Sequence, residues 1–226
     1  MPDIRYGVYY LPPEASALAV FGARWLGWDV ASGRDVAHQE ASIDVAAVTA
    51  TPRLYGFHGT MKPPFRLTDQ SDQAALTRAI EALAARRAPF DAPPLRLARL
   101  GSFLALMPSS ECPALRDLAE DCVKSLDTFR APAGEAEIAK RRASDLTPRQ
   151  DEILVRWGYP YILDEFRFHM TLTGKLDADT GDAAEAALKE LTTKLTRDPM
   201  PVHEICLVQQ IDGAPFRLLH RYPLTG

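Results

Sequence analysis

The sequence is poor in cysteine, and its cysteines form no pattern that would hold a fold together. Cys112, Cys122 and Cys206 are odd in number and contain no C-x-x-C pair. This spacing excludes a disulfide framework and a zinc site built on cysteine. We therefore expect free, mostly buried thiols in a reducing compartment.

Long hydrophobic runs are also missing. No segment approaches about 18 uninterrupted apolar residues, and residues 1–10 contain no basic stretch followed by an apolar core. These absences predict a cytoplasmic protein with no membrane association.

Neither sign of charge is in large excess, since the formal net charge is −4 at pH 7. A chain of this charge has no overall field that would attract a long polyanion. Nucleic acid is thus disfavoured as a partner, although a local basic cleft would be hidden in the sum, and a small-molecule substrate is favoured.

Several catalytic motifs are absent. The histidines show no HxxxH, HExxH or HxHxD spacing, which disfavours a metal site. There is no G-x-S-x-G motif of serine hydrolases and no glycine-rich loop of the P-loop or dinucleotide type. We therefore expect neither metal nor cofactor, and acid–base chemistry carried by side chains is what remains.

One phrase is present twice, and each copy reads hydrophobe-His-x-Thr. The first copy ends in Phe57-His58-Gly59-Thr60 and the second in Phe168-His169-Met170-Thr171. Side chains alternate faces along an extended strand, so each histidine shares a face with its threonine and each phenylalanine lies behind. A lone copy would carry little weight, because His and Thr are common in strands; the repetition is the signal.

The elements that follow each phrase occur in the same order in both halves. An amphipathic helix and two strands around a glycine follow each His-x-Thr strand, and the two histidines are offset by 111 residues. We infer an α+β fold, a single bilobal domain over 1–226 with approximate repeat units 53–107 and 164–222. Its pseudo-two-fold would relate two antiparallel sheets that form a central cleft, with helices packed outside.

Residues 130–157 differ in character from the rest and contain Pro132, Gly134 and many charges. The composition predicts a surface excursion with short helices around 135–142 and 148–157. It is interpreted either as a solvated connector or as a lid that brings Arg141, Arg142 or Arg149 over an anionic ligand.

Two histidines across a cleft suit in-line displacement at phosphorus. With ordinary pKa values near 6.5, one imidazole can accept a proton while the other donates one. Thr60 and Thr171 would donate hydrogen bonds to the non-bridging oxygens. By strand parity Lys62, Arg167 and Lys175 share the histidine faces and are candidate phosphate ligands. Tyr6 is a candidate ligand contact, with half-buried packing as the alternative.

The wording around both phrases resembles a known family. The segments WLGWD at 25–29, YGFHGTMKPPF at 55–65, RWGYPY at 156–161 and FRFHMTLTGKL at 166–176 look like the two-histidine phosphoesterase superfamily, in particular its bacterial branch associated with phosphonate metabolism. The resemblance spans nearly the whole chain. It implies a bilobal fold, no required metal, His58 and His169 as acid and base, and Thr60 and Thr171 as phosphate ligands.

The resemblance also implies a substrate, a small cyclic phosphate of phosphorylated ribose. Two alternatives stay open: an RNA 2'-5' ligase-like enzyme or 2',3'-cyclic phosphodiesterase acting on RNA ends, and a non-catalytic module that binds a phosphate ligand. The sequence does not assign which histidine is the base, and no feature of it indicates an oligomeric state.

Overall fold

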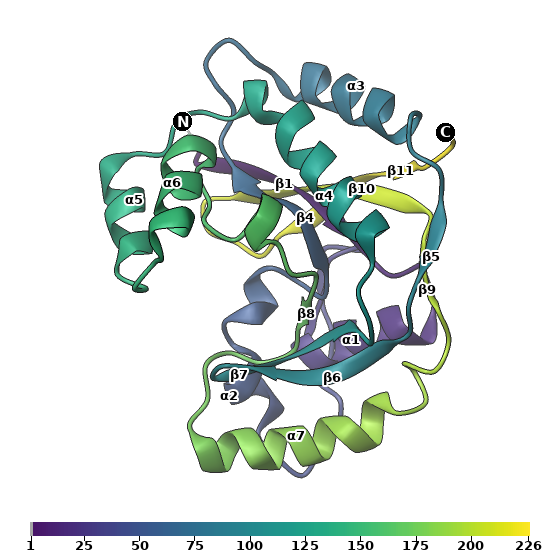
Figure 1. Cartoon of the computed structure of the whole chain (residues 1–226). Helices are drawn as coiled ribbons and strands as arrows, with labels where there is room; N and C mark the ends of the chain where they lie inside the picture. Colours follow the sequence, from purple (N-terminus) through teal and green to yellow (C-terminus); the bar gives the residue numbers. More distant parts are fainter. Residues whose placement is uncertain (1) are drawn as a thin grey trace.

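The chain folds as an α+β protein, as the sequence predicts (Figure 1). The computed structural model describes residues 2–226. Within them the strands are β1 (Ile4–Tyr10), β2 (Trp28–Asp29), β3 (Arg34–Asp35), β4 (Gly59–Phe65), β5 (Phe90–Ala92), β6 (Leu95–Leu100), β7 (Phe103–Pro108), β8 (Met170–Thr171), β9 (Met200–Val202), β10 (Glu204–Ile211) and β11 (Arg217–Pro223).

The helices begin at side-chain caps that the sequence supplies. Ser16, Asp72 and Asp177 each accept a hydrogen bond from a backbone N–H in the first turn of their helix. The α-helices are α1 (Ala17–Leu26), α2 (Val45–Thr49), α3 (Gln73–Ala84), α4 (Pro113–Ser125), α5 (Glu135–Arg142), α6 (Pro148–Trp157) and α7 (Ala178–Thr192). Short 3₁₀ helices cover Pro52–Leu54, Asp127–Phe129 and Leu163–Glu165.

The expected pair of sheets is joined into one. Strands β11-β10-β1-β4-β8-β7-β6 form a single sheet in that order, with antiparallel pairing throughout, and β2–β3 and β5–β9 form two small sheets. The junction is the pairing of Gly59 on β4 with Met170 on β8. A Cβ on Gly59 would lie 2.3 Å from the ring of Phe168, so the missing side chain lets the two strands meet.

The two halves exchange their hairpins. The first predicted unit contains β4-α3-β5-β6-β7 and the second contains β8-α7-β9-β10-β11, which is the same order of elements. The β6–β7 hairpin pairs with β8 of the second half, whereas β10–β11 lies beside β1, next to β4 of the first half. Helix α3 likewise packs on β10 and β11, and α7 packs on β6 and β7. A pseudo-two-fold between β4 and β8 would produce this exchange, with β1 as an additional strand.

The phenylalanines of both phrases face the core, as predicted. Phe57 and Phe168 are buried in the main hydrophobic cluster together with Met170 and the residues of α3, α4 and α7 that face the sheet. Figure 1 shows α3 and α4 over one part of the sheet and α7 below β6 and β7. The indole Nε1 of Trp25 donates to the carbonyl of Leu172 at 2.8 Å and ties α1 to the end of β8.

The strand expected around the second phrase is much shorter than the first. Strand β8 covers only Met170–Thr171, because the next residues turn toward β7. The backbone N–H groups of Leu172 and Thr173 both donate to the carbonyl of Leu104, at 2.9 and 3.2 Å. Thr173 also accepts a hydrogen bond from the Leu104 N–H through its hydroxyl.

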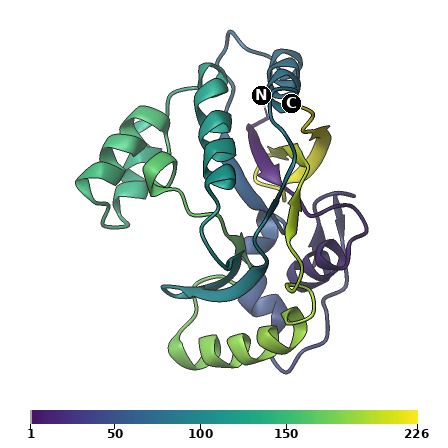
Figure 2. The same cartoon turned by 45° about the vertical axis from the view of Figure 1, so that its right-hand side comes forward.

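Residues 130–157, called the arm below, carry α5 and α6 at the predicted positions. Figure 2 shows the two helices projecting to one side of the sheet and its covering helices. Whether the arm moves as a lid stays a prediction. None of the described helices is long and apolar enough to span a membrane.

Candidate active site

Both histidine rings are held by the same backbone contact. Nδ1 of His58 lies 2.9 Å from the carbonyl oxygen of Gly56, and Nδ1 of His169 lies 2.8 Å from that of Arg167. A carbonyl oxygen can only accept, so Nδ1 carries the proton in each ring. In the neutral form of either ring, Nε2 is therefore the nitrogen that accepts a hydrogen bond or a proton.

Gly56 supplies its carbonyl from a conformation that favours glycine. Its φ is +72°, and a Cβ at this position would lie 2.8 Å from Val30. This turn directly precedes Phe57, whose buried ring fixes the start of β4. The local sequence thus orients His58 from both sides.

The pairing of β4 with β8 gathers the repeated residues on one face. Because Gly59 opposes Met170 in an antiparallel register, the next position on either side sets His58 opposite Thr171 and Thr60 opposite His169. Met170 points into the core, so these four neighbours point the other way. Diagonal neighbours in such a pair lie roughly 7–8 Å apart, which leaves room for a phosphate between the two rings. We call these four residues the His-Thr cluster.

Within the His-Thr cluster the first histidine and threonine contact each other directly. Nε2 of His58 lies 3.0 Å from Oγ1 of Thr60. Since Nδ1 carries the proton, the Thr60 hydroxyl donates to Nε2. The pairing of His and Thr that strand parity predicts is therefore present in the first phrase.

Aromatic rings surround His58. Tyr9 stacks on it with ring centroids 3.7 Å apart, and Tyr55 lies 6.4 Å away on a nearly parallel plane. Phe216 packs against both tyrosines at 5.8 and 5.7 Å. Burial among these rings lowers the pKa of His58 to about 4, against the hydrogen bond to Gly56, and the nearby His169 lowers the pKa further. His58 is consequently neutral at pH 7.

A cavity of about 250 Å³ opens beside the His-Thr cluster. His58, Thr171 and Lys175 line it, together with residues of the 3₁₀ turn before β4 and the loop after β8: Thr51, Pro52, Tyr55, Gly56, Thr173 and Gly174. Phe103 lines it as well and lies 5.9 Å from the ring of His169. The cavity is large enough for a sugar-sized ligand next to the two histidines.

The prediction that Lys62 shares the face of His58 and Thr60 is wrong. A β-bulge lies between two register positions, because Thr60 pairs with Tyr9 while Lys62 pairs with Val8. The extra residue turns Lys62 to the core side, where it is 2% exposed and its Nζ donates to the carbonyl of Val123 at 3.0 Å. Burial lowers its pKa to about 8, although Asp127 acts in the opposite direction.

Two further candidates lie outside the cavity. Tyr6 is buried on the opposite face of β1 from Tyr9, and its hydroxyl lies 3.1 Å from Gln73 and 3.2 Å from Gln209. Tyr6 is thus a packing residue, which was the alternative interpretation. The Arg167 side chain is exposed and does not line the cavity, and its contribution to the site is the carbonyl that holds His169.

Sequence reasoning missed the aromatic residues next to the histidines. The positions of Tyr9, Phe103 and Phe216 depend on which strands pair. A signal does exist: Phe103 begins β7, and Phe216 stands directly before β11, the equivalent strand of the other half. The β6–β7 hairpin thus places Phe103 beside His169, and the β10–β11 hairpin places Phe216 against Tyr9, which stacks on His58.

Across residues 2–226 no group of three or more His, Cys, Asp or Glu side chains is placed to hold a metal ion. The cysteines are free, with Cys122 and Cys206 buried and Cys112 partly buried. The fold and the site together define an α+β protein with two histidines and two threonines at the centre of its sheet.

The chain belongs to the family described as "Protein of unknown function (DUF1045)", whose model matches residues 60–217. This span begins at Thr60 and contains Lys62, His169 and Thr171.

Curated relatives are bacterial proteins named "Ribose 1,5-bisphosphate phosphokinase PhnN". The one from Janthinobacterium sp. (strain Marseille) is 35% identical over 233 residues, which cover 98% of this chain and 51% of the relative. The one from Laribacter hongkongensis (strain HLHK9) is 37% identical over 176 residues, which cover 77% of this chain and 41% of the relative. The chain spans about half the length of the curated relatives it matches.

Solved structures give a more distant likeness. E. coli LigT complexed with 3'-AMP is 16% identical with a TM-score of 0.45, and all of both chains is covered. E. coli LigT complexed with phosphate is 16% identical with a TM-score of 0.41, covering 100% of this chain and 99% of that one.

Proposed function

We propose that the chain is a phosphodiesterase that opens a small cyclic phosphate by acid–base catalysis between His58 and His169. The observation that supports this is the His-Thr cluster, in which two imidazoles held through Nδ1 and two hydroxyls share one face beside a cavity. Hydrolysis at phosphorus needs one group that takes a proton from water and another that protonates the departing oxygen. The resemblance of both phrases to two-histidine phosphoesterases supports the same reaction.

The surroundings suggest a role for each residue. His58 is neutral at pH 7 and suits the base, so His169 is assigned as the acid. Thr60 and Thr171 would donate hydrogen bonds to the non-bridging oxygens as negative charge develops. Lys175, which lines the cavity, would neutralise part of that charge. All proton transfers are assigned to side chains, so the proposed reaction requires no metal.

The relatives' name indicates a substrate. They are named as kinases of ribose 1,5-bisphosphate, whereas this chain contains no G-x-x-x-x-G-K-[ST] loop and carries the His-Thr cluster instead. We infer that the shared part makes the bisphosphate. Water would attack the phosphorus of ribose 5-phosphate 1,2-cyclic phosphate, the bond to O2 would break, and His169 would protonate O2. The product is ribose 1,5-bisphosphate.

The test is to incubate the purified protein with this cyclic phosphate and, separately, with nucleoside 2',3'-cyclic phosphates, and to follow the products by phosphorus NMR. We expect ribose 1,5-bisphosphate from the first, and a loss of about 100-fold to 10,000-fold in His58→Ala and in His169→Ala. Turnover of the nucleosides alone would favour the RNA-end enzyme. Binding of the sugar without turnover by the wild type would favour the non-catalytic module.

A further inference from the structure

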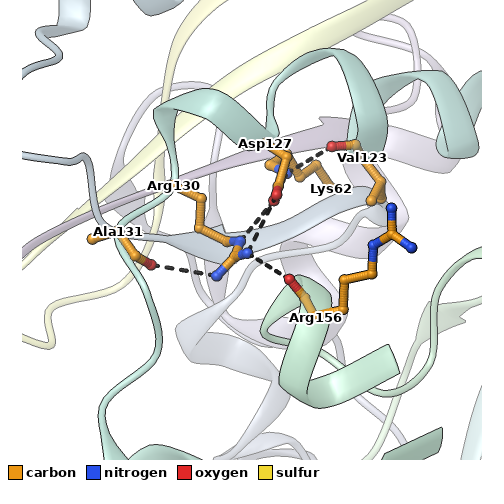
Figure 3. A network of polar contacts seen from close by, with 6 residues as sticks. All are labelled: Lys62, Val123, Asp127, Arg130, Ala131 and Arg156. Atoms are coloured by element: carbon orange, nitrogen blue, oxygen red, sulfur yellow. Dashed lines mark hydrogen bonds and ion pairs between the residues drawn. The ribbon is translucent and has the colours of Figure 1, made fainter. Parts of the chain in front are cut away.

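The charge of Lys62 is used in a polar network that fastens the arm to the body (Figure 3). Its Nζ lies 3.7 Å from the carboxylate of Asp127, which also accepts from Nε of Arg130 at 2.7 Å. Arg130 donates further to the carbonyls of Ala131 and Arg156, at 3.4 and 3.0 Å, and so binds both ends of the arm. This lysine therefore holds structure together and is not available to a ligand in the cavity.

The arginines of the arm do not line the cavity either. Arg142 donates to both carboxylate oxygens of Asp151, at 2.6 and 2.9 Å. Arg149 does the same with Asp164, at 2.8 and 2.9 Å. Arg141 packs over a tyrosine ring 4.4 Å away. An anion bound in the cavity must therefore find its donors elsewhere.

Two unpaired donors do line the cavity, the ammonium of Lys175 and the hydroxyl of Thr51. In the part of the chain that the structure describes, Lys62 and Lys124 form ion pairs with carboxylates, whereas Lys175 forms none. The Thr51 side chain makes no capping hydrogen bond to the 3₁₀ helix that it precedes. Both groups are thus able to donate to a ligand.

Two segments of the chain, 51–58 and 171–175, supply most of the cavity lining and meet at both ends of it. At one end the pairing of β4 with β8 sets His58 opposite Thr171. This end contains the His-Thr cluster, where the cyclic phosphate would react. The cavity extends from there between the two segments.

The second meeting point lies beside α2. The N–H of Gly174 donates to the carbonyl of Val48 at 2.8 Å, and a Cβ on Gly174 would lie 3.6 Å from Oγ1 of Thr51. Lys175 follows Gly174 directly, so Thr51 and Lys175 lie at the same end of the cavity. Both residues are exposed, which leaves this end open to solvent. The cavity therefore has a reactive end and a separate, cationic end.

We propose that Thr51 and Lys175 form a second anion subsite, which binds a phosphate monoester carried by the same sugar as the cyclic phosphate. This assignment rests on the proposed function. A monoester has several acceptor oxygens, so it can take hydrogen bonds from an ammonium and a hydroxyl together. With the cyclic phosphate between His58 and His169, the sugar would lie along the cavity and its monoester would reach the open end. The Lys175 charge would then contact the monoester and act through space on the reacting phosphate.

The experiment measures selectivity, defined as kcat/KM for ribose 1,2-cyclic phosphate with a 5-phosphate divided by kcat/KM without it. We expect Lys175→Gln to lower this ratio about 10-fold and Thr51→Val about 3-fold, because a charged donor contributes more than a neutral one. Lys175→Arg keeps the charge and should keep most of the selectivity. Lys189→Gln is the matched control, since it removes an exposed lysine of α7 outside the cavity and should leave the ratio unchanged.

An unchanged ratio in Lys175→Gln would overturn the subsite, even if the rates on both sugars fell equally, and an unchanged ratio in Thr51→Val would remove Thr51 from it. A wild type that does not distinguish the two sugars also refutes it. Circular dichroism verifies that each variant is folded, and Lys175→Met serves if Lys175→Gln is not.

The failure of the proposed function is separately visible. If the wild type hydrolyses neither sugar, that function fails, and calorimetric binding of ribose 5-phosphate then decides about the subsite. Weaker binding by Lys175→Gln than by Lys189→Gln supports it, whereas equal binding, or none by the wild type, refutes it.

Discussion

Two chemically identical side chains lie in different surroundings in this protein. Both rings are partly buried, but His58 has Tyr9 stacked on it and Tyr55 nearby, whereas His169 has Phe103 as its aromatic neighbour. Both rings nevertheless receive the same carbonyl contact at Nδ1. Any difference between the two rings in proton transfer therefore comes from their surroundings.

The first prediction concerns pH. Protonation of His58 abolishes its function as a base, and its pKa is lowered to about 4, so the acid limb of kcat/KM should fall near pH 4 instead of near 6.5. Tyr9→Leu removes the stacked ring and should move that limb upward. Initial rates from pH 3.5 to 8 measure it, with circular dichroism as the control for folding. A limb near 6.5 in both proteins would contradict the assignment of His58 as base.

The same shift affects stability. Between the ordinary pKa of 6.5 and about 4, the unfolded chain binds a proton at His58 that the folded chain does not. Stability should therefore decrease as pH falls through this window, and His58→Gln should show a smaller decrease. Urea unfolding at pH 4.5 and pH 7 tests the sign.

A second prediction separates Thr60 from Lys62, which stand two residues apart. Thr60→Val removes the hydroxyl on His58 Nε2, and we expect kcat to fall about 100-fold to 1,000-fold, with Thr60→Ser close to wild type. Lys62→Met keeps the aliphatic length of a side chain that faces the core, so its kcat should stay within a few-fold. Steady-state rates compare them, and a large kcat loss in Lys62→Met would show that this lysine does act at the site.

Strand parity correctly predicted which face His58, Thr60 and Phe57 point to, because side chains alternate faces with a period of two residues along a regular strand. It failed at Lys62, because the bulge inserts one residue between Thr60 and Lys62 and turns Lys62 to the opposite face. No local pattern in TMKPPF reveals where that residue is inserted.

At the scale of elements, α1 packs tightly against the segment that leads into β4. A Cβ on Gly22 of α1 would lie 1.9 Å from Cδ1 of Phe57, which precedes His58. Gly to Ala usually stabilises a helix by about 0.5–1 kcal/mol. Here the overlap reverses the sign.

The third prediction is that Gly22→Ala destabilises the protein by about 1–3 kcal/mol and lowers activity, because Phe57 must move. Gly181→Ala in α7 is the matched control. Its Cβ would be 3.4 Å from the flexible end of Arg99, and we expect it to be neutral or stabilising. Thermal unfolding of both variants gives the comparison, and equal effects would contradict it.

Sequence patterns predicted where the helices lie better than they predicted which strands pair. Helices α5 and α6 lie where the charge-rich stretch predicted them, and α6 begins at a local signal, the capping box of Thr147 and Gln150. Strand β8 is short because Leu172 and Thr173 hydrogen-bond to Leu104, a contact between residues far apart in the chain. Such pairing is set by tertiary contacts, which a single sequence does not display.

The whole molecule is held together by the exchange of hairpins between its halves. Neither half contains the partner strands of its own hairpin, since β6–β7 needs β8 and β10–β11 needs β1. Elements of both halves share one hydrophobic cluster. We therefore expect one cooperative unit.

The fourth prediction is a single unfolding transition. Tryptophan fluorescence and far-ultraviolet circular dichroism should give the same urea midpoint, and the separate fragments 1–110 and 111–226 should be unfolded until they are mixed. Two resolved transitions, or a fragment that folds alone, would contradict this expectation. Ser109–Cys112, between β7 and α4, is the point of division.

The carbonyl contacts on the two Nδ1 atoms have one more consequence. They give both rings the same tautomer, so the contacts on the rings themselves do not distinguish two opposite directions in which a substrate would bind. Only what surrounds the rings distinguishes these directions: Tyr9 and Tyr55 beside His58, and Phe103 beside His169. We therefore expect these aromatic neighbours to decide which histidine acts as base and which as acid. Replacing the neighbours of His58 should change the direction of proton transfer without altering either histidine.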